Sequence, residues 1–167
     1  MEEIVNKVAE SGLINLNLED LHQKGPRVVF DLKPLLFEEL ILKEKDFREA
    51  LKNTDWTVYQ NAFVAICCTA DAIIPTWAYM LVASYLEPVA KKLVFGDTDY
   101  LESVLFHEAI AKMDVAPFDG GRIIIKGCSK VKVPESAFVE LLAKLRPHAQ
   151  SIFYGEACST VPLYKKK

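Results

Sequence analysis

The chain has 167 residues and a formal net charge of −3, with 51% hydrophobic and 26% charged residues. This length suits one domain that buries roughly 70% of its unfolded surface without metal or disulfide support. The charge balance argues against a nucleic-acid partner, which usually demands a basic stripe. The composition is therefore typical of a globular cytoplasmic protein.

The N-terminal segment and the apolar runs indicate no targeting signal and no membrane association. The segment MEEIVNKVAESGLINL is acidic and lacks the apolar core of a secretory signal. The longest uncharged runs, 56–70 and 72–86, have 15 residues each, whereas a membrane-spanning helix needs about 20. In the cytoplasm, the four cysteines do not predict a disulfide framework.

The remaining pattern alternates short apolar runs with helical segments. The runs predict five buried parallel strands, at 28–32, 63–67, 92–95, 122–126 and 151–154. Helical periodicity predicts four helices, at 43–53, 75–90, 98–113 and 134–146. Alternation at this spacing is typical of right-handed βαβ units. We therefore expect an α/β fold, a three-layer sandwich with a mostly parallel five-stranded sheet and helices on both faces.

The same pattern predicts a simple domain organisation. Residues 1–26 are expected to form a helix and an irregular arm packed on the core. Residues 27–164 are expected to form a single α/β domain, and residues 165–167 a basic tail. The sequence has no low-complexity segment and no interdomain linker.

The helix expected at 75–90 differs from the others because it is apolar nearly all round. Its first charged residue is Glu87. Such a helix is either buried between a sheet and neighbouring helices or forms half of an oligomer interface. Both alternatives stay open, and the second predicts a homodimer through this helix.

Three strand-like runs end in a cysteine that is followed by Ser or Thr and shortly by Pro. The segments FVAICCTADAIIP, IIIKGCSKVKVP and SIFYGEACSTVP carry Cys68, Cys128 and Cys158. Ligands bind parallel α/β sheets at the carboxyl ends of the strands, so we expect all three thiols at one edge. Helix dipoles after Cys68 and Cys128 favour the thiolate, which binds metals and acts as a nucleophile.

Neighbouring polar residues would complete such an edge. Thr69, Ser129 and Ser159 offer hydroxyls that bond a sulfur or cap backbone groups. Asp71 and Glu135 are candidates for a fourth metal ligand, although both are also typical of an ordinary helix start. Thiolates select zinc, iron–sulfur clusters or copper(I). We expect zinc, with an iron–sulfur cluster as the alternative; cysteines that merely fill the core would need no cofactor.

Several of these segments resemble one known family. They are VAICCTADAIIPTWAYMLVASYLEPVAKKLVFGD, LILKEKDFREALKN, KGCSKVKVPESAFVELLAKLRP and GEACSTVPLYKK, and they resemble a mainly Bacteroidetes family labelled domain of unknown function 2480. The resemblance covers nearly the whole chain and implies that Cys68, Cys128 and Cys158 belong to the family's motifs. It also implies iron–sulfur assembly proteins as partners, because the family's genes often lie beside those for sulfur mobilisation and cluster assembly.

Three functions are consistent with these patterns. The first is a metal- or cluster-handling accessory protein of iron–sulfur assembly that uses the three-cysteine site. The second is an enzyme or persulfide carrier in which one thiolate reacts without metal. The third is a structural or dimeric interaction module with buried, inert cysteines. The absence of GxGxxG, GxxxxGK[ST] and GxSxG removes support for nucleotide binding and for a hydrolase elbow, and whether the chain is an enzyme stays open.

Overall fold

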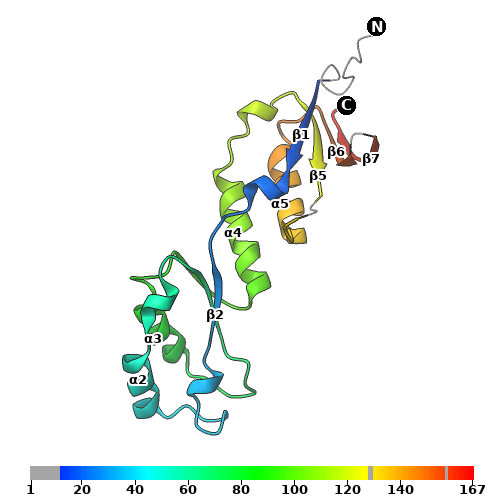
Figure 1. Cartoon of the computed structure of the whole chain (residues 1–167). Helices are drawn as coiled ribbons and strands as arrows, with labels where there is room; N and C mark the ends of the chain where they lie inside the picture. Colours follow the sequence, from blue (N-terminus) through cyan, green and yellow to red (C-terminus); the bar gives the residue numbers. More distant parts are fainter. Residues whose placement is uncertain (1–11, 128–129, 157) are drawn as a thin grey trace. The chain divides into compact units, whose positions relative to one another are not determined.

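The computed structural model describes residues 12–127, 130–156 and 158–167. Its helices and two sheets form a mixed α/β fold, and the chain divides into two compact units. Unit 2 comprises Lys24–Val104, and unit 1 comprises Met1–Gln23 and Leu105–Lys167. Unit 2 is thus inserted into the sequence of unit 1, as the colours of Figure 1 allow the reader to follow.

Unit 2 contains a parallel sheet in the order β2-β3-β4. Its strands are β2 (Arg27–Asp31), β3 (Phe63–Cys67) and β4 (Lys92–Phe95). Its helices are α2 (Glu44–Asn53), α3 (Thr76–Leu86) and the first part of α4 (Thr98–Lys112), with the short 3₁₀ helices η2 (Lys33–Leu35) and η3 (Trp56–Tyr59).

Apolar side chains four residues apart form the core of unit 2, because residues at this spacing share one face of a helix. On α2 they are Phe47 and Leu51, and on α3 they are Ala78, Val82 and Leu86. These five side chains pack with buried residues of the sheet and its connections in one cluster, which also includes Phe30, Leu32, Ala62, Val64 and Ile66.

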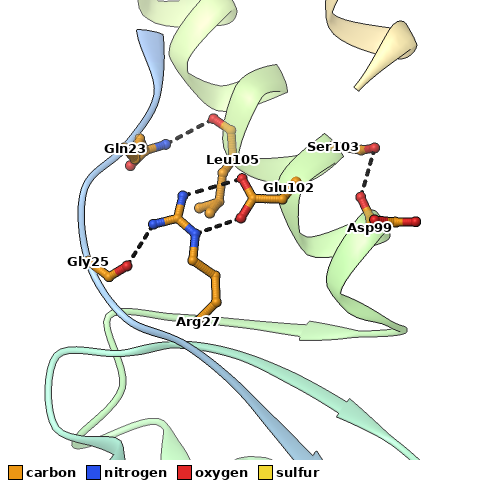
Figure 2. Close-up of polar contacts among 7 residues, drawn as sticks. All are labelled: Gln23, Gly25, Arg27, Asp99, Glu102, Ser103 and Leu105. Carbon is orange, nitrogen blue, oxygen red and sulfur yellow. Dashed lines mark hydrogen bonds and ion pairs between the residues drawn. The ribbon is translucent and has the colours of Figure 1, made fainter. Parts of the chain in front are cut away.

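A bidentate ion pair joins the start of β2 to α4 within unit 2. Arg27 Nε donates to Glu102 Oε1 at 2.6 Å, and Arg27 Nη2 donates to Glu102 Oε2 at 3.3 Å (Figure 2). Arg27 Nη1 also donates to the carbonyl of Gly25 at 2.7 Å. Because the planar guanidinium matches the carboxylate in geometry, this pair fixes the direction in which the first part of α4 leaves the sheet.

Unit 1 contains a sheet in the order β1-β5-β6-β7. The strands β1 (Leu13–Asn17), β5 (Arg122–Lys126) and β6 (Ser151–Glu156) are parallel, and β7 (Ser159–Lys165) runs antiparallel to β6. Its helices are the second part of α4 and α5 (Glu135–Leu145), with η1 (Leu18–Leu21) and η4 (Ala116–Phe118). Figure 1 shows β1 and β5 side by side, although they are far apart in the sequence.

The two units repeat one arrangement of elements. A shift of 59 residues maps β3 onto β5 and α3 onto α5 with identical bounds, and it maps the end of α2 onto the end of α4. The buried residues of the helices follow the same shift, with Ala78, Val82 and Leu86 in α3 and Ala137, Leu141 and Leu145 in α5. The first strands of the two units, β1 and β2, are also equivalent, but they are only 14 residues apart.

Backbone details repeat as well. Asn61 (φ 58°) and Gly120 (φ 67°), which are 59 residues apart, both adopt the left-handed conformation. Asn17 and Asp31 end the first strand of their sheets, and the Oδ1 atom of each accepts the backbone N–H two residues on. The chain therefore contains an internal structural repeat, with unit 2 as a contiguous member and unit 1 as a member split by it.

The predicted strands and helices are confirmed, with small shifts at their ends, but one five-stranded sandwich sheet is not. The five predicted strands fall into two sheets, with β2, β3 and β4 in one and β5 and β6 in the other, where two further strands, β1 and β7, pair with them. β1 lies within residues 1–26, for which the sequence predicts a helix and an arm instead, and β7 has no predicted counterpart. The domain bounds 1–26, 27–164 and 165–167 stay a prediction beside the two compact units. Over the described ranges, every helix is too short or too polar to cross a membrane.

Candidate functional site

Two cysteines of the predicted three-cysteine site, Cys68 and Cys158, follow strands of different sheets. Cys68 follows β3 of unit 2, whereas Cys158 is exposed in the turn between β6 and β7 of unit 1. Cys128 and Ser129 lie outside the described residues. The prediction of one shared edge assumed a single sheet, and that assumption is wrong because β3 and β6 belong to separate sheets.

The prediction of a metal site formed by these cysteines is wrong, and so is the function built on it. In the described part of the chain, no three His, Cys, Asp or Glu side chains group closely enough to hold a metal ion. The proposed further ligands are exposed, Asp71 in the loop after β3 and Glu135 at the start of α5, and Ser159 is exposed at the start of β7. Zinc or an iron–sulfur cluster as cofactor, and iron–sulfur assembly proteins as partners, stay predictions.

The carboxyl edge of the unit 2 sheet does bring polar groups together around Asp31, the last residue of β2. Its Oδ1 accepts the backbone N–H groups of Lys33 at 2.9 Å and Thr69 at 3.0 Å, and its Oδ2 accepts the Thr69 hydroxyl. Burial by itself would raise the pKa of Asp31, but the hydrogen bonds from Thr69 and Lys33 outweigh it and lower the pKa. The Thr69 hydroxyl was expected to bond a sulfur or cap a backbone group. It instead donates to Asp31 and so holds the loop after β3 against β2.

The thiol at the end of β3, that of Cys67, lies in surroundings that raise its pKa. Burial raises the pKa of Cys67 above its ordinary value, and negative charges raise it further, those of Asp31, Cys68 and Asp97. Burial also raises the pKa of Tyr79 in α3, and the negative charges of the Cys68 and Cys67 thiolates and of Asp31 raise it further. Cys68 packs against the core cluster of unit 2. Because the thiolate is the reactive form of cysteine, the acidic surroundings of Cys67 oppose its use as a nucleophile.

The matching edge of unit 1 has different chemistry. Under the shift of 59 residues, Lys126 takes the place of Cys67 and Glu156 the place of Asp97, and these two form an ion pair at 3.2 Å. Asn17 stands where unit 2 has Asp31. The repeat therefore does not carry one set of polar groups at both edges, which argues against a ligand that both edges bind in the same way.

Replacing Asp31 with alanine is expected to lower the free energy of unfolding by about 1–2 kcal/mol, because the loop after β3 loses its acceptor. Asp31→Asn is expected to lose less, since Asn17 makes the equivalent bond in unit 1. Because its pKa is lowered in the folded state, the charge of Asp31 stabilises the fold fully at pH values above the unfolded pKa of 3.8. This stabilisation is lost as the pH falls through the folded pKa. Urea unfolding at neutral and acidic pH measures both effects, and an equal loss for Asp31→Ala at both pH values would contradict them.

An apolar surface on α5 and β6 of unit 1 has a counterpart on α3 and β4 of unit 2. In unit 1 it is a pocket of about 200 Å³ lined by Ile125, Phe138, Val139, Leu142, Tyr154 and Leu163. The rings of Phe138 and Tyr154 meet edge to face there, with centroids 5.9 Å apart. In unit 2 the residues at the same positions, Tyr79 and Phe95, meet in the same way at 4.9 Å.

We call the surface in unit 2 the α3–β4 face. We assign to it the exposed Met80 and Phe95 together with Tyr79, Ala83 and Leu93, which are partly buried and also pack against the core of unit 2. Met80 is 67% exposed and Phe95 is 65% exposed, and α3 contains no charged residue. In unit 1, Leu163 of β7 covers part of the equivalent pocket. The unit 2 sheet has no strand in that position among the residues that the structure describes, because β4 is its last strand.

Comparison with known proteins identifies a family. No curated protein and no solved structure matches the chain. Residues 2–166 match the family model described as protein of unknown function (DUF2480), which confirms the resemblance seen in the sequence. Since the match extends over nearly the whole chain, the chain belongs to the DUF2480 family.

Proposed function

We propose that this protein is an interaction module that forms a homodimer through the α3–β4 face of unit 2. The observation that carries the proposal is the exposure of two large apolar side chains on that face, Met80 at 67% and Phe95 at 65%. The residues at these two positions in unit 1, Val139 and Tyr154, line one pocket, and the Phe95 ring packs against Tyr79 of the helix that carries Met80. Single exposed apolar residues are ordinary, whereas adjoining ones mark a surface that a partner covers.

The composition of the face supports a protein partner. Interface cores are enriched in aromatic residues and methionine and depleted in charged residues, and this face joins Tyr79, Met80 and Phe95 on an uncharged helix. The opposite side of α3 packs inside unit 2 through Ala78 and Val82. The all-round apolar character of α3 is thus explained if one side belongs to the core and the other to an interface.

A second copy of the chain is the partner whose chemistry fits this face. A two-fold axis places the same surface patch of both copies against each other. A patch without charges on α3 can face itself without like-charge repulsion. Burying Met80 and Phe95 in this way removes apolar surface from water, which is the main favourable term in association.

Replacing Met80 with aspartate is expected to dissociate the dimer, because each copy would bring a carboxylate into an apolar contact. We expect sedimentation equilibrium and light scattering to show a concentration-dependent dimer for the wild type. For Met80→Asp we expect a dissociation constant that is higher by a factor on the order of ten or more.

The internal repeat supplies a matched control. Val139 occupies the position of Met80 in α5 and is 69% exposed, so Val139→Asp introduces the same charge at the same helix position in unit 1. It is expected to leave the dimer unchanged, and circular dichroism checks that both variants are folded. A wild type that is monomeric at all concentrations, or a dimer that Met80→Asp does not weaken, overturns the proposal.

A further inference from the structure

The outer edge of β4 is unpaired in the part of the chain that the structure describes, since β4 is the last strand of its sheet. The Gly96 N–H donates to the carbonyl of Ile66 in β3 at 3.0 Å. Backbone groups of alternate residues in a parallel strand point to opposite sides. The N–H and C=O groups of Leu93 and Phe95 therefore point away from β3, toward the outer edge.

In unit 1 the equivalent sheet edge, that of β6, pairs with an antiparallel strand. The residues at the positions of Leu93 and Phe95 are Ile152 and Tyr154 in β6, and both pair with the antiparallel strand β7. β7 also brings Leu163 to the apolar pocket of that unit. One half of the repeat thus has an antiparallel strand and an apolar side chain at a position where, among the described residues, the other half has neither.

We propose that the outer edge of β4 pairs with β4 of a second copy, so that the two three-stranded sheets become one six-stranded sheet. This inference rests on the proposed self-association and names the contacts that form it. A two-fold axis that passes between the two β4 strands makes the paired strands antiparallel, which is the direction that β7 takes beside β6. Strand addition of this kind supplies main-chain hydrogen bonds at an exposed sheet edge.

The outward groups select one register. Directly opposed residues of an antiparallel pair point their backbone groups either both toward each other or both away. Leu93 therefore pairs with the partner's Phe95, and the Val94 residues of the two copies face each other across the axis. In this register every outward N–H and C=O of Leu93 and Phe95 is bonded to the partner strand. If Leu93 were opposite the partner's Leu93, or Phe95 opposite the partner's Phe95, some of these groups would stay unbonded. Leu93 and Phe95 share one side of the strand, so the Phe95 ring, already against Tyr79, packs on the partner's Leu93.

The other edge of the sheet provides a contrast. The Leu32 N–H donates to the carbonyl of Cys67, so the outward residues of β2 are Arg27, Val29 and Asp31, and two of the three are charged. Charged residues are a common protection of edge strands against pairing. The outward residues of β4 have no such protection. Unit 1 shows the same contrast: β6, the counterpart of β4, is paired on this side by β7, while β1, the counterpart of β2, is an edge strand.

Amide hydrogen exchange of the full chain, followed by NMR at concentrations where the dimer dominates, tests the pairing directly. In the wild type, the amides of Leu93 and Phe95 are expected to exchange as slowly as those of Val94 and Gly96. In Met80→Asp, Leu93 and Phe95 are expected to exchange at least about tenfold faster, while Val94 and Gly96 keep their bonds to β3 and their protection.

A proline substitution tests the same hydrogen bonds by another route. Leu93→Pro removes an outward N–H and no hydrogen bond to β3. It is expected to raise the dissociation constant of the dimer by a factor on the order of ten or more, since each copy loses one bond to its partner. Val29→Pro makes the same change at the outer edge of β2 and is expected to leave the dimer unchanged.

The outcomes separate this inference from the proposed function. A dimer that Met80→Asp dissociates, but in which the Leu93 and Phe95 amides exchange rapidly, overturns the strand pairing and leaves the proposed function in place. A protein that is monomeric at all concentrations overturns both. The exchange measurement on the wild type needs no change in β4, so it decides the question even if Leu93→Pro does not fold.

Discussion

Replacing Phe47 with alanine is expected to lower the free energy of unfolding by about 3–5 kcal/mol. The Phe47 ring is fully buried on α2 and meets Trp77 of α3 edge to face, with ring centroids 6.0 Å apart. Truncation removes the apolar atoms from the core and leaves a cavity that the neighbouring helices fill only in part, so both terms add to the loss. Urea unfolding followed by circular dichroism measures it.

The repeat predicts a second loss of the same kind. Phe106 lies 59 residues after Phe47, at the equivalent core position on α4, and is 1% exposed. Phe106→Ala is therefore expected to cost a similar amount. Val58→Ala, at a position that is 64% exposed, is the surface control and is expected to change stability by less than about 0.5 kcal/mol. A loss below about 1 kcal/mol for either phenylalanine would show that its position is not part of a closely packed core.

Replacing Gly155 with alanine is expected to lower the free energy of unfolding by about 2–3 kcal/mol. Gly155 has φ 117°, a conformation that residues with a side chain rarely adopt. A Cβ at this position would lie 2.6 Å from the carbonyl oxygen of Ser159. Because that oxygen belongs to the backbone of β7, the clash is relieved only if β7 moves away from β6.

Gly96 is the matched position in unit 2 and is expected to tolerate alanine better. Its φ is 148°, so the backbone is strained in the same sense, but the added Cβ would meet the side chain of Tyr100 at 2.9 Å. The Tyr100 ring can rotate away, which leaves only its Cβ at 3.2 Å, so the expected loss for Gly96→Ala is about 1–2 kcal/mol. Urea midpoints of the two variants give the order, and a larger loss for Gly96→Ala would contradict the role assigned to the β7 backbone.

The positions of most elements were predictable because each has a local signature. The run FVAIC predicted β3, and Pro75 marked the start of α3. β1 and β7 lack such signatures. The segment LINLN is short and contains two asparagines, and STVPLYK contains Pro162, which argues against a strand in the middle of a sheet. In the structure β7 is an edge strand, where a proline is tolerated.

The assignment of strands to sheets was not predictable from these signatures, because it depends on pairing between distant segments. The same five runs can form one sheet or contribute to two. The available signal was the spacing of 59 residues, which separates Pro75 from Pro134. The recurrence around Cys68 and Cys128 suggested one binding site, but the runs before these cysteines, β3 and β5, belong to different sheets and are equivalent strands of the repeat.

The α3–β4 face was half predictable. A helix without charge before Glu87 predicted either burial or an oligomer interface, and in the structure Val82 is buried while Met80 is exposed. The contribution of Phe95 was not predictable, because β4 had to be placed at the edge of a sheet first. The raised pKa of Cys67 depends in the same way on Asp31, which comes from a neighbouring strand.

The insertion of unit 2 into the sequence of unit 1 sets an order of events on the ribosome. β1 pairs with β5 in the register of Leu13 with Arg122, so 109 more residues must be synthesised after Leu13 before Arg122 is present (122 − 13). At roughly 5–20 residues per second, β1 waits about 5–20 s for its partner. During that time the contiguous segment Lys24–Val104 emerges with every strand of the β2-β3-β4 sheet. The nascent chain can therefore complete unit 2 first, and the closure of unit 1 around so long an intervening segment becomes the late, entropically costly step.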